Sequence, residues 1–126
     1  LGVFPPPASI ILPEKIGLAL AEDLLLSGRT IDADEALDMG LIQKVFNDQK
    51  ALNTGANEWI EKFILPRSAS SLRFGVKASR AKFNHVLRNF LPQLEFIYIK
   101  QLMESHDANE GIQAFMEKRE PTWKNS

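Results

Sequence analysis

Three observations predict a mainly α-helical protein with one short strand. Apolar residues recur at three- and four-residue spacing through most of the chain, which is the spacing of one buried helix face. Serines, aspartates and glycines stand where these segments begin and end, as helix caps do. Only residues 41–46, Leu-Ile-Gln-Lys-Val-Phe, resemble a strand. With 126 residues, 44% hydrophobic and 25% charged, the chain has the composition of a globular protein.

The first nine residues, Leu-Gly-Val-Phe-Pro-Pro-Pro-Ala-Ser, predict a stiff loop with an apolar lining. Three consecutive prolines remove three backbone donors and fix φ, so this stretch cannot be a central strand or a helix interior. A short helix is expected next, capped by Ser9 and ending at Gly17. A second helix is expected over residues 18–26, with Gly28 as its C-terminal stop.

Asp32 and Glu35 form a capping-box pattern that opens a further short helix, which stops at Gly40. The predicted strand over residues 41–46 follows it. A single strand cannot satisfy its backbone hydrogen bonds alone, so we expect it to pair with a segment outside this chain or with the N-terminal loop.

Four helices are expected in the rest of the chain. Ser68 or Ser70 caps the second of them, Pro92 suits the first turn of the third, and Asp107 with Glu110 forms a capping box for the fourth. Their expected bounds are residues 49–65, 68–89, 92–103 and 107–119.

Composition excludes several classes of function. The chain carries 15 basic and 16 acidic residues, a net charge of -1, which gives no reason to expect a nucleic-acid partner. It contains no cysteine, so disulfides, thiol nucleophiles and cysteine-ligated metals are excluded within it. No apolar run has the length of a membrane span and no signal sequence is recognisable, so we expect a cytoplasmic protein without a membrane partner. The start at Leu1 reads as mid-protein sequence, so we expect a fragment.

Residues with catalytic potential are few. The two histidines, His85 and His106, lack the spacing of a metal site, and we expect no metal. Glu14, Glu22 and Asp23 fit a solvated helix surface better than the dry pocket that general acid–base catalysis needs. We therefore expect no catalytic residue and no cofactor in this chain.

Two other features indicate surfaces that contact further protein chain or a ligand. The run Phe96-Ile97-Tyr98-Ile99 points around the whole circumference of a helix, so we expect it to be buried by missing chain or by other subunits. Phe115 and Lys118 are three residues apart on the last predicted helix and share a face. Such a pair can stack on a base and meet a phosphate, although a buried Phe with a snorkelling Lys is the commoner arrangement.

The order of these segments resembles a known family. The resemblance rests on four segments of the sequence: Leu24-Leu25-Leu26-Ser27-Gly28-Arg29, Ile31-Asp32-Ala33-Asp34-Glu35-Ala36, Met39-Gly40-Leu41-Ile42 and Glu110-Gly111-Ile112-Gln113-Ala114-Phe115-Met116-Glu117-Lys118-Arg119. Together, at this separation, they are similar to the second half of the enoyl-CoA hydratase/isomerase (crotonase) family. The resemblance covers essentially the whole chain.

The resemblance implies the C-terminal helical (trimerisation) part of the crotonase-like α/β spiral fold. Residues 1–48 would end the core, with its acyl-pocket loop, short helices and one strand. Residues 49–126 would form the helical region for oligomerisation and CoA covering. The family's second catalytic glutamate would lie just upstream of Leu1, so neither catalytic carboxylate would belong to this chain.

The resemblance also implies roles for individual residues. Val3, Phe4, Pro5 and Pro6 would line the acyl pocket. Phe115 and Lys118 match terminal-helix residues that reach the adenine and phosphates of CoA, often those of a neighbouring subunit. The expected partners are an acyl-CoA thioester, of which CoA is part, and further copies of the chain in a trimer or a dimer of trimers.

One departure from the family pattern bears on the substrate. Many hydratases have a glycine-rich stretch where this chain has Pro6-Pro7-Ala8-Ser9, so a differently shaped acyl pocket is expected. In this loop the chain resembles most the cyclic dienoyl-CoA hydratases of anaerobic aromatic degradation. We therefore expect a hydratase (a lyase) that acts through an enolate held in an oxyanion hole, inactive as residues 1–126 alone. The alternatives are an enoyl- or dienoyl-CoA isomerase of the same fold and a non-catalytic helical association module.

Overall fold

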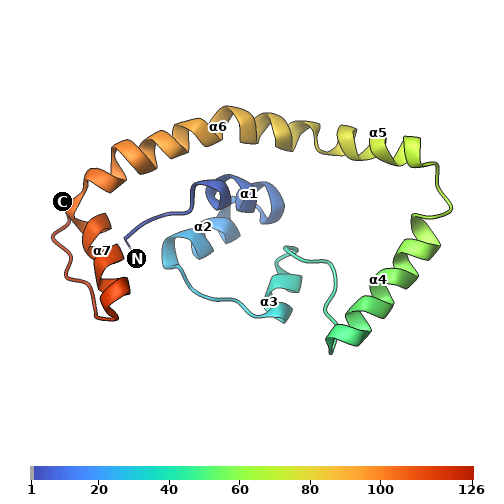
Figure 1. Ribbon diagram of the computed structural model, residues 1–126, viewed down its shortest axis with the longest axis horizontal. Coiled ribbons are helices and arrows are strands. Elements are labelled where there is room, and N and C mark those ends of the chain that lie inside the picture. Colours follow the sequence, from blue (N-terminus) through green and yellow to red (C-terminus); the bar gives the residue numbers. More distant parts are fainter. Residues whose placement is uncertain (1) are drawn as a thin grey trace. The chain divides into compact units, whose positions relative to one another are not determined.

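A computed structural model describes residues 2–126, and Leu1, the first residue of the predicted loop, lies outside the described residues. Within that range the chain forms seven α-helices and one 3-10 helix (Figure 1). They fall into two compact units. One contains the chain up to Gly28 together with His85–Ser126, and the other contains Arg29–Asn84.

The first unit begins with a helical hairpin. Helix α1 (Pro6–Ile16) packs against α2 (Leu18–Ser27), and Gly17 lies between them with φ of 83°. Gly28 ends α2 in the left-handed conformation and donates its amide to the carbonyl of Leu24 at 3.0 Å, as expected from its position. Ile10 and Ala21 are buried in this hairpin.

The predicted N-terminal loop is shorter than expected, because α1 begins at Pro6. Prolines suit the first turn of a helix, where the missing N–H has no intrahelical partner and φ is already helical. Ser9 is therefore not the N-cap, and its hydroxyl donates to the carbonyl of Pro5 at 3.0 Å from inside the helix. The expected stop at Gly17 is confirmed.

The same unit is completed by α6 (Ala81–Lys100) from His85 onwards, the 3-10 helix η1 (Leu102–Glu104) and α7 (His106–Glu117). The predicted helix boundary near Pro92 is wrong, because α6 runs through this proline. Pro92 removes only one main-chain donor from a 20-residue helix. The break lies instead at Arg80, which ends the preceding helix.

The N-cap of helix α7 lies two residues before the predicted one. The Ser105 hydroxyl oxygen accepts the amide of Ala108 at 3.2 Å and is the N-cap, so the predicted capping box of Asp107 and Glu110 is wrong. Both carboxylates accept hydrogen bonds from the C-terminal residues 119–125 instead. Ala108 and Ala114 are buried on the inner face of the helix.

The second unit contains α3 (Ala33–Asp38), α4 (Gln49–Phe63) and α5 (Ala69–Ser79). Each begins at a side-chain cap. Asp32 and Ser68 are confirmed as caps, accepting the amides of Glu35 at 2.8 Å and of Ser71 at 3.4 Å, and Asp48 caps α4. The Glu35 carboxylate pairs with Arg29 at 2.6 Å.

The predicted strand over residues 41–46 is not formed, and residues 2–126 contain no strand. The amides of Leu41 and Ile42 donate to the carbonyl of Ala36, at 2.9 and 3.3 Å, and close the turn after α3. A ladder requires a partner strand, and the described part of the chain offers none. Phe46 packs instead against Gly55 of α4, where the ring occupies the space a Cβ would need.

Little of the apolar surface is buried. The chain exposes 9772 Å². A folded protein of 14.2 kDa exposes about 6,800 Å², and two separate domains of half that mass about 8,200 Å² together. The core residues are small, apart from Ile10, and among those described no large side chain is fully buried. The exposed large side chains include Leu26, Trp59, Phe63, Leu65, Phe74, Phe90, Phe96 and Ile99.

Candidate functional site

The predicted CoA-binding pair lies at the C-terminal end of α7. Phe115 is in the last turn of the helix and its side chain is 69% exposed. Lys118 is one residue beyond the helix, also exposed, and its amide donates to the carbonyl of Phe115 at 3.2 Å. An aromatic ring and an ammonium group are thus presented to solvent within one turn of the chain.

Lys118 has an unusual backbone conformation. It adopts the left-handed region, with φ of 55° and ψ of 41°. The amide of the next residue, Arg119, donates to the carbonyl of Ala114 at 3.0 Å. This bond closes the helix in the manner of a Schellman motif, whose left-handed position is usually glycine. A side chain at this position is disfavoured by contact between Cβ and the following carbonyl oxygen.

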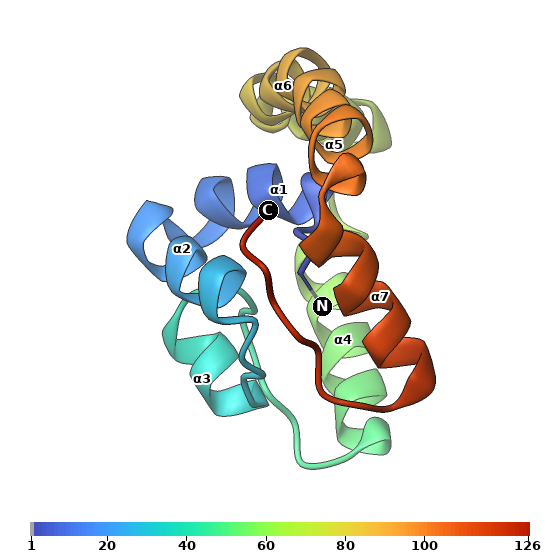
Figure 2. The same cartoon turned by 90° about the vertical axis from the view of Figure 1, so that its left-hand side faces the viewer.

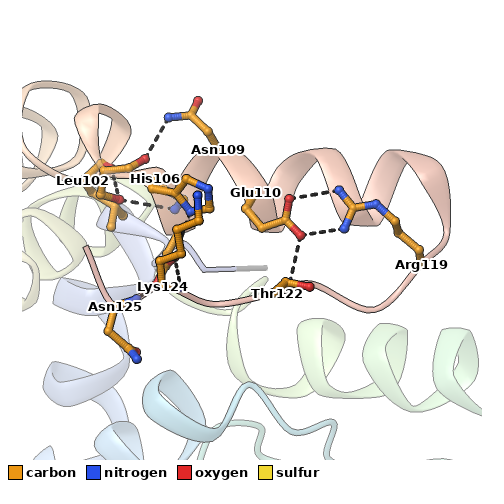
Figure 3. A network of polar contacts seen from close by, with 11 residues as sticks. Leu102, His106, Asn109, Glu110, Arg119, Thr122, Lys124 and Asn125 are labelled. Carbon is orange, nitrogen blue, oxygen red and sulfur yellow. Dashed lines mark hydrogen bonds and ion pairs between the residues drawn. The ribbon is translucent and has the colours of Figure 1, made fainter.

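A bidentate ion pair lies next to this turn. Arg119 donates from Nη1 and Nη2 to the two carboxylate oxygens of Glu110, at 2.5 and 2.9 Å (Figure 3). Its Nε donates to Glu117 at 2.6 Å. The hydrogen bond from Arg119, with a second from the amide of Thr122, lowers the pKa of Glu110 from 4.5 to about 2. Two parallel charge-assisted bonds also fix orientation, which one bond would not do.

The C-terminal tail, residues 120–126, folds back along α7 (Figure 2). Asp107 accepts the amides of Lys124 and Asn125 at 2.8 and 2.7 Å, and these bonds, led by that of Lys124, lower its pKa. The amide of Thr122 donates to Glu110 at 2.8 Å. Sequence reasoning assigned Asp107 and Glu110 to a capping box and missed this role. Their three-residue spacing, followed by a proline-containing tail, was the available signal.

The predicted acyl-pocket residues lie at the start of the same unit. Val3 and Phe4 are half-buried, Pro5 is exposed, and Pro6 is the first residue of α1. The ring of Phe4 meets that of Tyr98 edge-on, with centroids 5.6 Å apart. Helix α6 thus holds this loop from one side.

Gly2 places the beginning of the loop against α7 and the tail. Its φ is 67°, and a Cβ there would lie 2.7 Å from the carbonyl oxygen of Asp107 and 3.1 Å from the indole of Trp123. The loop therefore contacts the N-terminal end of α7, whereas Phe115 lies eight residues further along. At 1.5 Å per residue the two ends are about 12 Å apart. Gly2, just before the predicted acyl-pocket residues, therefore meets the start of α7, whereas Phe115 lies at the other end of this helix.

The described residues contain no group of three or more histidine, cysteine, aspartate or glutamate side chains that could hold a metal ion. His106 has its Nδ1 3.1 Å from a carboxylate oxygen of Asp107. Within residues 2–126, no helix is both long and apolar enough to cross a membrane.

The second unit carries a groove of about 280 Å³ between residues 43–46 and α4. Phe46, Trp59 and Ile60 give it a mainly apolar lining, with Lys44 at its edge. It belongs to the set of apolar surfaces that residues 2–126 leave open.

Comparison with known proteins identifies the family. Residues 1–126 match the family model of enoyl-CoA hydratase/isomerase. The chain belongs to this family. The resemblance drawn from the sequence motifs is therefore confirmed, and so is its mainly helical second-half character, since the family members match along about half of their length.

Individual members of the enoyl-CoA hydratase/isomerase family are similar over nearly all of this chain. Cyclohexa-1,5-dienecarbonyl-CoA hydratase of Thauera aromatica is 46% identical over 125 residues, 99% of this chain and 47% of that protein. Carnitinyl-CoA dehydratase of Citrobacter koseri is 30% identical, over 98% of this chain and 48% of that protein. The chain spans about half the length of the curated relatives it matches.

A solved structure supports the fold. The crystal structure of an enoyl-CoA hydratase/isomerase from Pseudoalteromonas atlantica T6c superposes with a TM-score of 0.80 at 31% identity, covering 97% of this chain and 48% of that one. The chain therefore has the fold of this family's helical half.

Proposed function

We propose that the whole protein adds water to an unsaturated acyl-CoA thioester, with a cyclic dienoyl-CoA as its substrate. The observation that carries this proposal is the 46% identity to a cyclohexa-1,5-dienecarbonyl-CoA hydratase. The Pro6-Pro7-Ala8-Ser9 sequence at the predicted acyl pocket, which replaces a glycine-rich stretch, agrees with an unusual acyl group.

In the proposed reaction the thioester oxygen is held by two backbone N–H donors while an enolate forms. Such preorganised donors supply a large share of the catalysis of acyl chemistry. A carboxylate delivers the water and the proton. We assign both to the part of the family fold that this chain does not span, so residues 1–126 alone are expected to be inactive.

This chain's proposed contribution is substrate binding. Phe115 stacks on the adenine of CoA and Lys118 meets a phosphate, while Val3, Phe4, Pro5 and Pro6 line the acyl pocket. The support for the first pair is that both side chains are exposed at one helix end. The support for the second set is that the Tyr98 ring and the start of α7 hold the loop in a defined place.

We also propose that copies of the chain assemble as a trimer or a dimer of trimers. The support is the exposure of large apolar side chains on α4, α5 and α6, which a single chain of this size leaves open. Sedimentation analysis of the whole protein would measure the assembly directly. A cytoplasmic location stays a prediction.

The hydratase proposal is tested with the whole protein, cyclohexa-1,5-diene-1-carbonyl-CoA and a linear enoyl-CoA. The expected result is a product heavier by one water, formed faster from the cyclic substrate. A product of unchanged mass with a moved double bond would favour the isomerase alternative. Absence of both turnover and CoA binding would favour the association module, whose supporting observation is the same exposed apolar surface.

A further inference from the structure

We propose that Glu110 is a positioning residue for CoA binding: through its bidentate pair with Arg119 it holds Lys118 in the left-handed conformation from which the ammonium group reaches a CoA phosphate. This inference rests on the proposed function and adds a residue to it. Glu110 itself touches no ligand in this proposal, because it acts through the two residues that follow the helix.

Lys118 has an unfavourable backbone conformation. With φ of 55° it is one of only two non-glycine residues in the described chain at positive φ, the other being Asn125 in the tail. Asparagine visits this region readily, whereas lysine does so at a cost from its Cβ. Something in the surrounding structure must therefore hold Lys118 there.

Arg119 anchors the residue that follows Lys118 to the helix. Its amide closes the turn on Ala114, and its guanidinium is held by two carboxylates of α7. With both ends of Arg119 fixed to the helix, the preceding peptide cannot relax to a right-handed conformation without breaking these bonds. The conformation of Lys118 is thus set by bonds that Lys118 does not make.

Glu110 and Glu117 do not hold Arg119 equally. The Glu110 side chain is 14% exposed and Glu117 is 48% exposed, so water competes less for the Glu110 pair. Glu110 also accepts the amide of Thr122, which orients its carboxylate towards Arg119. Figure 3 shows Glu110 between the guanidinium and the tail. Glu110 is therefore the stronger and more rigid of the two anchors.

A lysine at this position is itself unusual. Glycine ends a helix in this conformation without strain, as Gly28 does at the end of α2. A cation kept in a strained position by a bidentate ion pair departs from that rule, and such departures cluster at functional sites. The fixed backbone sets the direction in which the long, flexible Lys118 side chain leaves the helix end. Less entropy is then lost when its ammonium group binds a phosphate.

The test uses the whole protein and adenosine 3′,5′-bisphosphate as the probe, with binding measured by calorimetry. Glu110→Gln and Lys118→Ala are each expected to weaken binding about tenfold, the effect of one charge-assisted contact. The double variant is expected to bind no more weakly than Lys118→Ala, because Glu110 acts through the lysine. Glu104→Gln is the control, because it removes a nearby carboxylate of η1 that makes no ion pair among the described residues. This variant should bind the probe as tightly as the parent does.

Arg119→Lys is a second variant, because lysine keeps the charge but cannot make two parallel bonds to Glu110. Arg119→Lys should also weaken binding of the probe. Both Glu110→Gln and Arg119→Lys should raise KM for the acyl-CoA and leave kcat unchanged. Unchanged affinity in both variants, or additive losses in the double variant, would overturn the positioning role. If the parent protein itself does not bind the probe, the proposed function fails, which is a separate result.

Discussion

The guanidinium of Arg119 pairs with the carboxylate of Glu110 across nine residues, through two bonds of 2.5 and 2.9 Å. The pair joins the end of α7 to its middle, and the amide of Thr122 joins the C-terminal tail to the same carboxylate. A turn, a helix and a tail therefore depend on one ionised side chain.

This dependence predicts a specific loss of stability in acid. Folding lowers the pKa of Glu110 from 4.5 to about 2, so the folded state favours the charged carboxylate. The stabilisation is fully present above about pH 4.5 and is lost as the pH falls to about 2. In Glu110→Gln the melting temperature should therefore fall less steeply over this interval than in the parent, as followed by circular dichroism.

Some acid sensitivity should remain in that variant, because hydrogen bonds also lower the pKa of Asp107 and Glu117. Glu104→Gln is the control, since no described ion pair holds its carboxylate, and it should reproduce the parental slope. Equal slopes in the parent and in Glu110→Gln would show that this carboxylate is not coupled to folding.

The left-handed conformation of Lys118 predicts that Lys118→Gly stabilises the protein. Removing the side chain relieves about 1–2 kcal/mol of backbone strain, and the greater freedom of glycine in the unfolded chain offsets about 0.4–1 kcal/mol of this. A net gain of about 0.5–1 kcal/mol is expected in urea unfolding of the whole protein. Lys118→Ala keeps the Cβ and should show no such gain, so equal stability of the two variants would contradict the strain.

The contact between Gly55 and Phe46 predicts opposite effects for two glycines in helices. A Cβ at Gly55 would overlap the ring of Phe46, whereas nothing lies within 4 Å of a Cβ at Gly75. Alanine gains about 1 kcal/mol of helix propensity at either site. Gly75→Ala should therefore stabilise by about that amount, and overpacking of about 1–3 kcal/mol should make Gly55→Ala neutral or destabilising.

Urea unfolding measures both glycine variants, and Phe46→Leu in the Gly55→Ala background should recover stability because it removes the ring. A stabilising Gly55→Ala would show that Phe46 moves aside easily. A destabilising Gly75→Ala would show that another part of the whole protein packs closely on α5.

Local signals in the sequence predicted most helix boundaries correctly where one side chain decides them. Asp32 and Ser68 cap their helices as expected, and Gly28 ends α2. Each of these residues satisfies backbone groups within four positions, so the sequence around it contains the whole interaction.

The errors arose where an alternative partner competes. Ser105 takes the cap of α7 because the tail and Arg119 occupy Asp107 and Glu110, a contact that no local pattern reveals. The strand over residues 41–46 fails for the opposite reason, because its ladder needs a partner that residues 2–126 do not provide.

At the candidate site, too, local features could be predicted from the sequence and features that depend on distant contacts could not. The residue types and spacing of Phe115 and Lys118 indicated CoA contact through the family resemblance, and both side chains are exposed. The strained conformation of Lys118 could not be predicted, because it depends on a salt bridge between residues nine positions apart.

Exposure of the Phe115 ring allows binding and folding to be separated. The side chain is 69% exposed, so Phe115→Ala should change the free energy of unfolding by no more than about 0.5 kcal/mol. Stacking of an aromatic ring on a base is worth about 1–3 kcal/mol. Phe115→Ala should therefore weaken CoA binding at least about fivefold and reduce the rise in melting temperature that CoA gives the whole protein.

Met116→Ala is the matched control, because Met116 is the next residue, is apolar and is 77% exposed. It should keep the parental protection by CoA, since a neighbouring helix position points about 100° away. If stacking is the cause, adenosine should also protect Met116→Ala more than Phe115→Ala. Added salt should leave this difference between the variants unchanged, because stacking involves no charge. Equal loss of protection in both variants would mean that the end of α7 contributes through packing, and Phe115 would then be no adenine contact.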